Sequence, residues 1–384
     1  MKQSSADIGN VDGAWLELRA YVEQLGANNI LLVTLHASYQ TCGAAAIVRA
    51  LFADKKITRV SDYSENPKAE EVVKLLQKLD RHEGYDLILA IGGGSAMDCA
   101  KLIKAYWHSP DPVYGHLLKG QELTPCDLPL AAVPTTAGSG SEATHFAVVY
   151  LGNEKISVAH KKLLPDRSFL VPSLLKSLPR HVAASCAIDA LCQGIESYWS
   201  IHSTPESREL AAEAIQKSWR AMIPAVLDKK TDDLQLMAEA SHLAGKAINL
   251  TKTTAPHAVS YALTTFFGVS HGHAVGLLMP LFLVYNDAVT SSDCLDPRGV
   301  AWVKNSVSQI ARMLGYDKVE HLADGLTKRL GELGLETSLV KLGIQSDQDR
   351  ALIIQHGFNP QRVNNNPRKL TQSALLTMLQ CKSG

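Results

Sequence analysis

The stretch from Tyr85 to Ile91 (YDLILAI) runs directly into Gly92-Gly93-Gly94-Ser95 and then into a helical stretch, Ala96 to Trp107. An apolar run this short, ending in glycines, is typical of a strand buried on both faces of a sheet. Backbone N–H groups at a helix start attract anions, and glycines let a pyrophosphate approach closely. The turn is neither GxGxxG nor a P-loop, so two interpretations stay open: a phosphate site, or a tight turn that needs positive φ.

The rest of the first half alternates in the same way. Further strands are predicted at 29–34, 57–60 and 128–133, and helices at 43–52 and 68–79. Alternation of this kind predicts an α/β fold, in which helices cover a parallel sheet. The stretch 110–127 is expected to be a loop-rich insertion.

The second half changes character at about Pro179. Helical periodicity dominates in stretches such as 206–226, 232–250 and 297–313, and the apolar run 274–285 is expected to be a buried helix. We therefore expect two domains, an α/β dinucleotide-binding domain over 1–179 and an all-α domain over 180–384.

Composition excludes several classes of protein. The 384 residues carry 38 Lys+Arg and 38 Asp+Glu, and this balance argues against nucleic acid or a membrane surface as a partner. No apolar stretch approaches the roughly 20 residues of a membrane span, and the N-terminus lacks the apolar core of a secretory signal. Seven cysteines without a CxxC pair fit reduced thiols, so we expect a cytoplasmic protein.

A second loop of small and hydroxyl-bearing residues, 134–142 (PTTAGSGSE), follows the strand at 128–133. Loops at the ends of adjacent parallel strands often line one dinucleotide crevice. The alternative is an irregular loop without a ligand.

A metal site is the third candidate feature. Asp189 and Gln193 lie four residues apart, which places them on one helix face, and His257, His271 and His273 follow later. One carboxylate, two imidazoles and an amide oxygen can hold a divalent cation with one position left open for a substrate. The alternative is a set of structural, hydrogen-bonded histidines.

Together these motifs resemble the iron-containing (group III) alcohol dehydrogenase family. GGGSAMDCAK, PTTAGSGSEAT, the Asp189 helix and the His257/His271 pair occur in the family's order between residues 29 and 368. The resemblance implies a homodimeric oxidoreductase that uses Fe(II) or Zn(II) and a nicotinamide cofactor to interconvert an aldehyde and a primary alcohol. It also implies an N-terminal nucleotide domain and a C-terminal metal domain.

The resemblance makes Asp189, His257 and His271 metal ligands. The family's remaining ligand is a histidine, and at that position this chain has Gln193, a weaker ligand. Gln193 either binds the metal through its oxygen, or holds a water that does so, or marks weak or lost metal binding. A family histidine assigned to proton relay falls at Tyr261, where packing is the alternative role. His273 is the other relay candidate, unless it is structural.

The resemblance also implies a set of cofactor-binding residues: Asn66, Gly93, Gly94, Ser95, Thr135, Thr136, Ser139, Val148 and Lys155. Members that prefer NADH carry an acidic residue after the first strand. This chain has Leu35-His36-Ala37-Ser38 there, which favours NADPH, because no carboxylate repels a 2′-phosphate.

Within the family, several stretches are similar to phosphonoacetaldehyde reductases, among them 61–68 and 249–261. This similarity implies reduction of phosphonoacetaldehyde to 2-hydroxyethylphosphonate. The phosphonate-binding candidates are Lys252, Thr253, Thr254 and His160, although Lys252 also fits a solvated helix end. Three alternatives stay open: a general short-chain alcohol dehydrogenase, a lyase similar to dehydroquinate synthase, and a metal-free nucleotide-binding pseudoenzyme.

Overall fold

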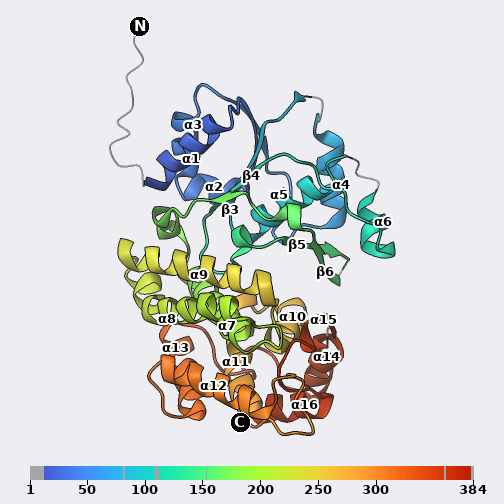
Figure 1. The fold of residues 1–384 in the computed structure, drawn as a ribbon, viewed down its shortest axis with the longest axis vertical. Coiled ribbons are helices and arrows are strands. Elements are labelled where there is room, and N and C mark those ends of the chain that lie inside the picture. Colours follow the sequence, from blue (N-terminus) through green and yellow to red (C-terminus); the bar gives the residue numbers. More distant parts are fainter. Residues whose placement is uncertain (1–12, 81–82, 109–111, 153, 359, 382–384) are drawn as a thin grey trace. The chain divides into compact units, whose positions relative to one another are not determined.

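The computed structural model describes residues 13–80, 83–108, 112–152, 154–358 and 360–381, which form two compact units (Figure 1). The first lies within 1–136 and 141–178, and the second within 137–140 and 179–384. No helix of the described residues combines the length and apolarity that a membrane span needs.

The first unit contains a five-stranded sheet in which every pairing is parallel. Its strands stand in the order β2 (Lys56–Val60), β1 (Asn29–Val33), β3 (Leu87–Gly92), β4 (Leu130–Pro134) and β7 (Arg167–Ser168). The parallel sheet predicted from the sequence is confirmed.

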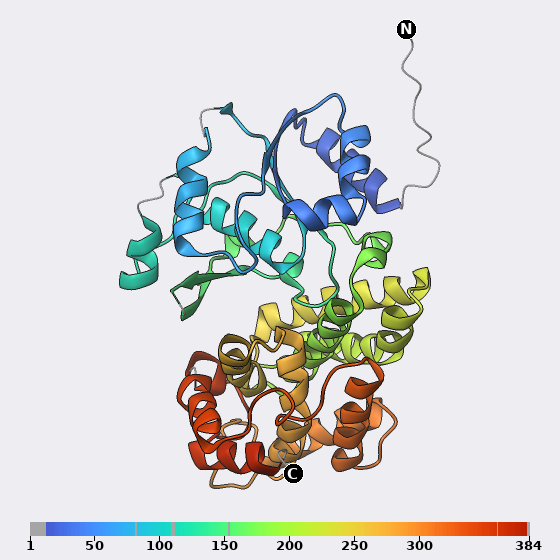
Figure 2. The same ribbon diagram turned by 180° about the vertical axis from the view of Figure 1, so that it is seen from behind.

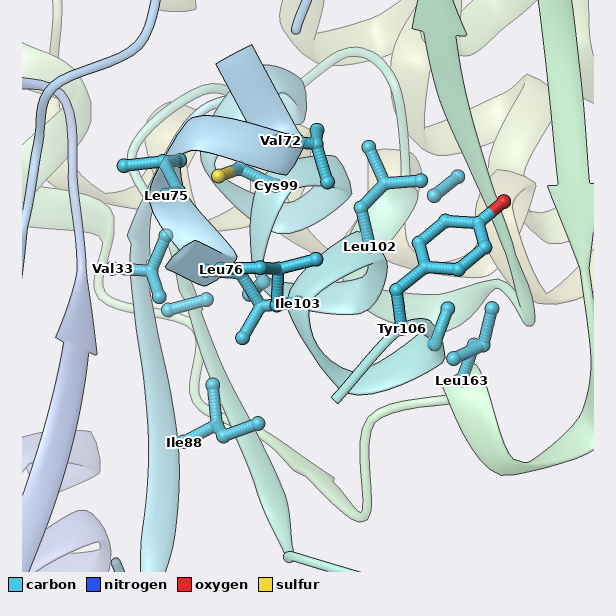
Figure 3. Packing of buried hydrophobic residues seen from close by; sticks show 14 of the residues in the cluster. Val33, Val72, Leu75, Leu76, Ile88, Cys99, Leu102, Ile103, Tyr106 and Leu163 are labelled. Carbon is cyan, nitrogen blue, oxygen red and sulfur yellow. The ribbon is translucent and has the colours of Figure 1, made fainter. Parts of the chain in front are cut away.

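Helices bury both faces of this sheet. They are α1 (Gly13–Gln24), α2 (His36–Thr41), α3 (Ala44–Leu51), α4 (Ala69–Lys78), α5 (Gly94–Ala105) and α6 (Pro112–Lys119). Val33 and Ile88 pack with the apolar side chains of α4 and α5 (Figure 3), whereas Ile30, Leu32 and Leu89 pack with α1 and α3. Because neighbouring residues of the central strands face opposite helix layers, β1, β3 and β4 are buried along their whole length and are mostly apolar.

Two elements differ from the sequence-based expectation. The stretch 110–127 is not only loop, because α6 forms within it. An antiparallel hairpin, β5 (Phe146–Leu151) and β6 (Glu154–Ala159), was not anticipated. Only Ala147 and Val149 of β5 and Val158 of β6 are fully buried, although β5 (FAVVYL) is itself a continuous apolar run and β6 (EKISVA) is more polar.

The strand order reverses direction at β1. The chain adds β2 on one side of β1 and then returns to add β3 on the other side. Ligands of open α/β sheets bind outside the carboxyl ends of the strands at such a point. Here those ends carry His36, after β1, and the glycine turn 92–94, after β3.

A buried lysine ties α5 to the segment that follows the second loop. Lys101 is fully buried, and its ammonium donates to the hydroxyls of Ser141 and Thr144 at 3.0 Å and to the carbonyl of Phe146 at 2.9 Å. The Ser141 hydroxyl in turn donates to Asp98 at 2.8 Å. One cation therefore holds the segment 141–146 that leads into β5.

The second unit is helical. Its elements are α7 (Arg180–Trp199), α8 (Pro205–Leu227), α9 (Thr231–Thr251), α10 (Ala255–Phe267), α11 (His271–Asp287), α12 (Val300–Met313), α13 (Val319–Glu332), α14 (Asp347–Gly357), α15 (Pro360–Val363) and α16 (Gln372–Cys381). Helices α7, α8 and α9 pack side by side, and α11 packs against α7, α10 and α13 (Figures 1 and 2). The helical character predicted from the sequence is confirmed.

Replacing Lys101 with Met should loosen the segment 141–146. The substitution removes the donor that Ser141, Thr144 and Phe146 share, which costs about 2 kcal/mol of local stability, equivalent to roughly 30-fold faster hydrogen exchange. Hydrogen–deuterium exchange of peptides covering 141–151 measures this. The control is Lys74→Met, at an exposed position of α4. Equal exchange in the two variants would show that Lys101 does not stabilise this segment.

Candidate metal centre and nucleotide loops

One face of α7 carries three buried polar side chains. Asp189, Gln193 and Glu196 are spaced by four and three residues, so helical geometry places them on one side. Their exposed fractions are 5%, 4% and 0%. Two carboxylates buried this deeply need compensation by hydrogen bonds or a cation.

His257 lies between the two carboxylates. It stands in the first turn of α10, where its Nδ1 donates to Glu196 and its Nε2 lies 3.2 Å from Oδ1 of Asp189. Burial by itself lowers the pKa of His257, but the carboxylates of Glu196 and Asp189 outweigh burial and raise the pKa to about 9. This pocket therefore strongly favours positive charge.

Glu196 also organises the chain that leads into α10. Its Oε1 accepts from the backbone N–H and the hydroxyl of Thr254 at 2.9 and 3.0 Å, and from the N–H of His257 at 3.3 Å. The indole of Trp199 donates to the same hydroxyl at 3.0 Å. Glu196 was not among the residues predicted from the sequence, although its position seven residues after Asp189, on the same helix face, was a usable signal.

Two glycines bring α11 close to α7. A Cβ at Gly272 would clash with the carbonyl oxygen of Ser185 and would lie 2.8 Å from Cβ of Asp189, and one at Gly276 would clash with Ile188. The absent side chains let His271, the first residue of α11, approach Asp189. The rings of His271 and His257 lie 5.3 Å apart, centroid to centroid.

The spacing of these groups suits a metal ion. One donor atom from each of Asp189, His257 and His271 lies within 4.8 Å of the other two. Donor atoms around a divalent cation lie about 3–4 Å apart when each bond is about 2.1 Å long. Of the four ligands predicted from the sequence, Asp189, His257 and His271 thus lie close enough together to bind one metal ion.

Gln193 lies beside Asp189. Its Nε2 donates at 3.3 Å both to Oδ2 of Asp189 and to the carbonyl of Ser139. Its Oε1 is buried and accepts no hydrogen bond from the residues that the structure describes. Since a buried oxygen without a donor is costly, Oε1 is suited to receive a cation or a water.

The other residues predicted for this site have different surroundings. The Nε2 of His273 donates to the carbonyl of Glu336 at 2.7 Å, and Tyr261 stacks on His271 with 5.5 Å between ring centroids. Lys252 is an exposed residue that ends α9 with φ +60°, and Nδ1 of His160 accepts from the backbone of Lys162. Whether any of these four has a chemical role stays a prediction.

Six of the nine predicted nucleotide residues, all in the first unit, gather at the ends of β3 and β4. A Cβ at Gly93 would lie 3.1 Å from Cγ2 of Thr136, and the N–H of Thr135 donates to the carbonyl of Gly92 at 2.9 Å. Asn66 has a left-handed backbone, and its N–H donates to the hydroxyl of Ser95 at 3.0 Å. With Gly94 as its first residue, α5 starts at this point.

The remaining three nucleotide candidates are distributed over both units. Val148 in β5 and Lys155 in β6 belong to the first unit, and both interact with Asp98. Ser139 belongs to the second unit, where its carbonyl accepts from Gln193.

Next to His36 lies an arginine that was not predicted from the sequence. Nη2 of Arg59, in β2, lies 2.9 Å from Nδ1 of His36, just after β1. Because a guanidinium only donates, Nδ1 must accept, which leaves Nε2–H as a further donor. The contact depends on the pairing of β1 with β2, and spacing along the chain gave no sign of it.

Comparison with known proteins identifies the class. Residues 8–172 match the family "iron-containing alcohol dehydrogenase", and residues 183–382 match the C-terminal part of the same family. The chain therefore belongs to the iron-containing alcohol dehydrogenase family and is an NAD(P)-dependent oxidoreductase.

Individual relatives include enzymes that act on different aldehydes and alcohols. The chain is 34% identical to a phosphonoacetaldehyde reductase of Streptomyces viridochromogenes over 82% of its own length and 80% of the relative's. It is 31% identical to a long-chain-alcohol dehydrogenase of Geobacillus thermodenitrificans, covering 89% and 88%. A solved sulfoacetaldehyde reductase of Bifidobacterium kashiwanohense, in complex with NAD⁺, aligns with a TM-score of 0.86 at 28% identity, covering 100% and 99%.

Replacing Gly272 with Ala should destabilise the second unit, because the new Cβ would clash with the α7 backbone at Ser185. That backbone is held within its helix and cannot shift without moving α7. Overpacking of this kind costs about 1–3 kcal/mol, which lowers the melting temperature by roughly 3–10 °C. Thermal unfolding measures the shift. Gly331 of α13, where a Cβ meets open space, is the matched control and should tolerate Ala without loss. Equal melting temperatures for the two variants would contradict the close-packing account.

Proposed function

We propose that Asp189, His257, His271 and Gln193 hold Fe(II) or Zn(II), and that the enzyme interconverts an aldehyde and a primary alcohol with a nicotinamide cofactor. The observation that carries this proposal is the meeting of three donor atoms within 4.8 Å. When bound, the metal supplies Lewis-acid polarisation of a carbonyl, and the cofactor supplies the hydride.

Two neighbouring residues orient the proposed metal ligands. By accepting from Nδ1 of His257, Glu196 fixes the ring so that Nε2 faces Asp189 and serves as the ligand atom. Gln193 holds Oδ2 of Asp189, which leaves Oδ1 for the metal. The buried Oε1 of Gln193 supports direct ligation or a bound water over lost metal binding.

For the cofactor, we propose that Asn66, Gly93, Gly94, Ser95, Thr135, Thr136, Ser139, Val148 and Lys155 bind the dinucleotide. The pairing of Arg59 with His36 supports NADPH over NADH, because both side chains offer donors where a 2′-phosphate would lie. No carboxylate occurs in the segment 34–38 that follows β1.

For the substrate, we propose phosphonoacetaldehyde, reduced to 2-hydroxyethylphosphonate. The support is the similarity to the phosphonoacetaldehyde reductase, with the sulfoacetaldehyde reductase as a second relative that acts on a two-carbon aldehyde with an anionic head. The long-chain-alcohol dehydrogenase favours a second candidate, reduction of uncharged aldehydes. Lys252 and His160 stay candidates for binding the anion, and His273 and Tyr261 for proton transfer.

Three further expectations stay predictions of this proposal. They are a dinucleotide domain over 1–179 with a metal domain over 180–384, a homodimer, and a cytoplasmic location. Nucleic acid and membrane are not proposed as partners.

The test is NAD(P)H oxidation by the purified chain with phosphonoacetaldehyde and with propionaldehyde, before and after chelation and re-addition of Fe(II) or Zn(II). We expect kcat/KM to be at least about 100-fold higher for the phosphonate, activity to be lost on chelation, and NADPH to have the lower KM.

Other outcomes would select the alternatives. Equal use of both aldehydes would favour a general alcohol dehydrogenase. Absence of activity with either metal would favour a pseudoenzyme, and product formation without net NAD(P)H oxidation would favour a lyase.

A further inference from the structure

Arg362 in α15 is a half-buried arginine with unused donors. Its Nη1 donates to the hydroxyl of Thr253 at 2.9 Å, and its guanidinium lies 5.1 Å from the ring centroid of Tyr261. Among the described residues, no carboxylate forms a salt bridge with it. By contrast, Arg368, six residues later, is neutralised by Asp293 at 2.8 Å.

This cation is close to the candidate metal ligands. Tyr261, which Arg362 overlies, stacks on His271 with 5.5 Å between centroids and 18° between planes. The Arg362 guanidinium and the His271 imidazole therefore both contact the ring of Tyr261.

The same backbone supports both groups. Thr253 binds Arg362, and the next residue, Thr254, binds Glu196, the carboxylate that orients His257. Asn365 fixes this dipeptide from the C-terminal side by donating to the carbonyl of Thr253 at 3.0 Å. Arg362 is thus built into the framework of the ligands and is not a freely moving surface cation.

The chemistry of such a group suits a tetrahedral oxyanion. A guanidinium carries five N–H donors in a planar fork that matches phosphate-like oxygens, and a half-buried one without a carboxylate attracts an anion strongly. In phosphonoacetaldehyde and sulfoacetaldehyde, a single methylene separates the carbonyl from the anionic head. The cation and the metal ligands must therefore be near neighbours, as they are here.

We propose that Arg362 binds the phosphonate or sulfonate head of the aldehyde and that Thr253 positions its guanidinium. This inference rests on the proposed function, because the carbonyl is assigned to the candidate metal centre. Arg362 replaces Lys252 as the first choice for anion binding, since the Lys252 side chain is exposed and makes no hydrogen bond or ion pair with the described residues.

The first experiment measures binding without turnover. The metal-loaded full chain and its variants are titrated with ethylphosphonate and with ethanesulfonate by calorimetry. Arg362→Gln should weaken binding by at least about 20-fold, Arg362→Lys should keep part of the affinity, and the exposed control Arg312→Gln should not change it. The anion that binds with the higher affinity identifies the natural head group.

The second experiment uses turnover. Arg362→Gln should raise the KM for the anionic aldehyde by about 50-fold or more and leave that for propionaldehyde within about threefold. A wild type that binds ethylphosphonate through Arg362 but oxidises no NAD(P)H would overturn the proposed function and keep the anion site.

Two results would overturn the inference itself. One is unchanged ethylphosphonate affinity in Arg362→Gln, with Arg362→Lys showing the same melting temperature as wild type. The other is a selective loss of anionic-aldehyde binding in Lys252→Ala and not in the Arg362 variants.

Discussion

Two buried carboxylates of α7, seven residues apart, hold the two ring nitrogens of one histidine. Glu196 accepts from Nδ1 of His257, and Asp189 faces its Nε2. Carboxylates in such a buried place need compensation by hydrogen bonds or by a cation. The N-terminal turn of α10 is fastened through Thr254, and α11 reaches the same position because Gly272 lets it pack against α7.

The fold could be predicted from the sequence because its signals are local. Short apolar runs marked β1, β3 and β4 to within two residues, and helical periodicity marked α8, α9 and α12. The hairpin β5–β6 was missed, although the apolar run FAVVYL of β5 was a usable strand signal; β6 (EKISVA) is more polar and only partly buried. Helix α6 was missed in a stretch that looked like an insertion.

Some residues of the candidate site could likewise be predicted from the sequence, and others could not. Asp189, His257 and His271 were recognisable from residue type and family order, and the structure brings them within reach of one ion. Arg59 and Arg362 were not recognisable, since their partners His36 and Thr253 lie 23 and 109 residues away in the sequence. Only the folded chain places those cations beside the residues that the sequence had already marked.

The central claim is that these side chains bind one divalent cation. Chain freed of metal by chelation, loaded anaerobically with Fe(II) and passed through gel filtration should retain about one ion per chain, measured by elemental mass spectrometry. Asp189→Ala and His257→Ala should retain well below a tenth of that amount, whereas the exposed Asp232→Ala should match wild type. The account would be contradicted if wild type retained no metal after loading, or if Asp189→Ala retained as much metal as wild type.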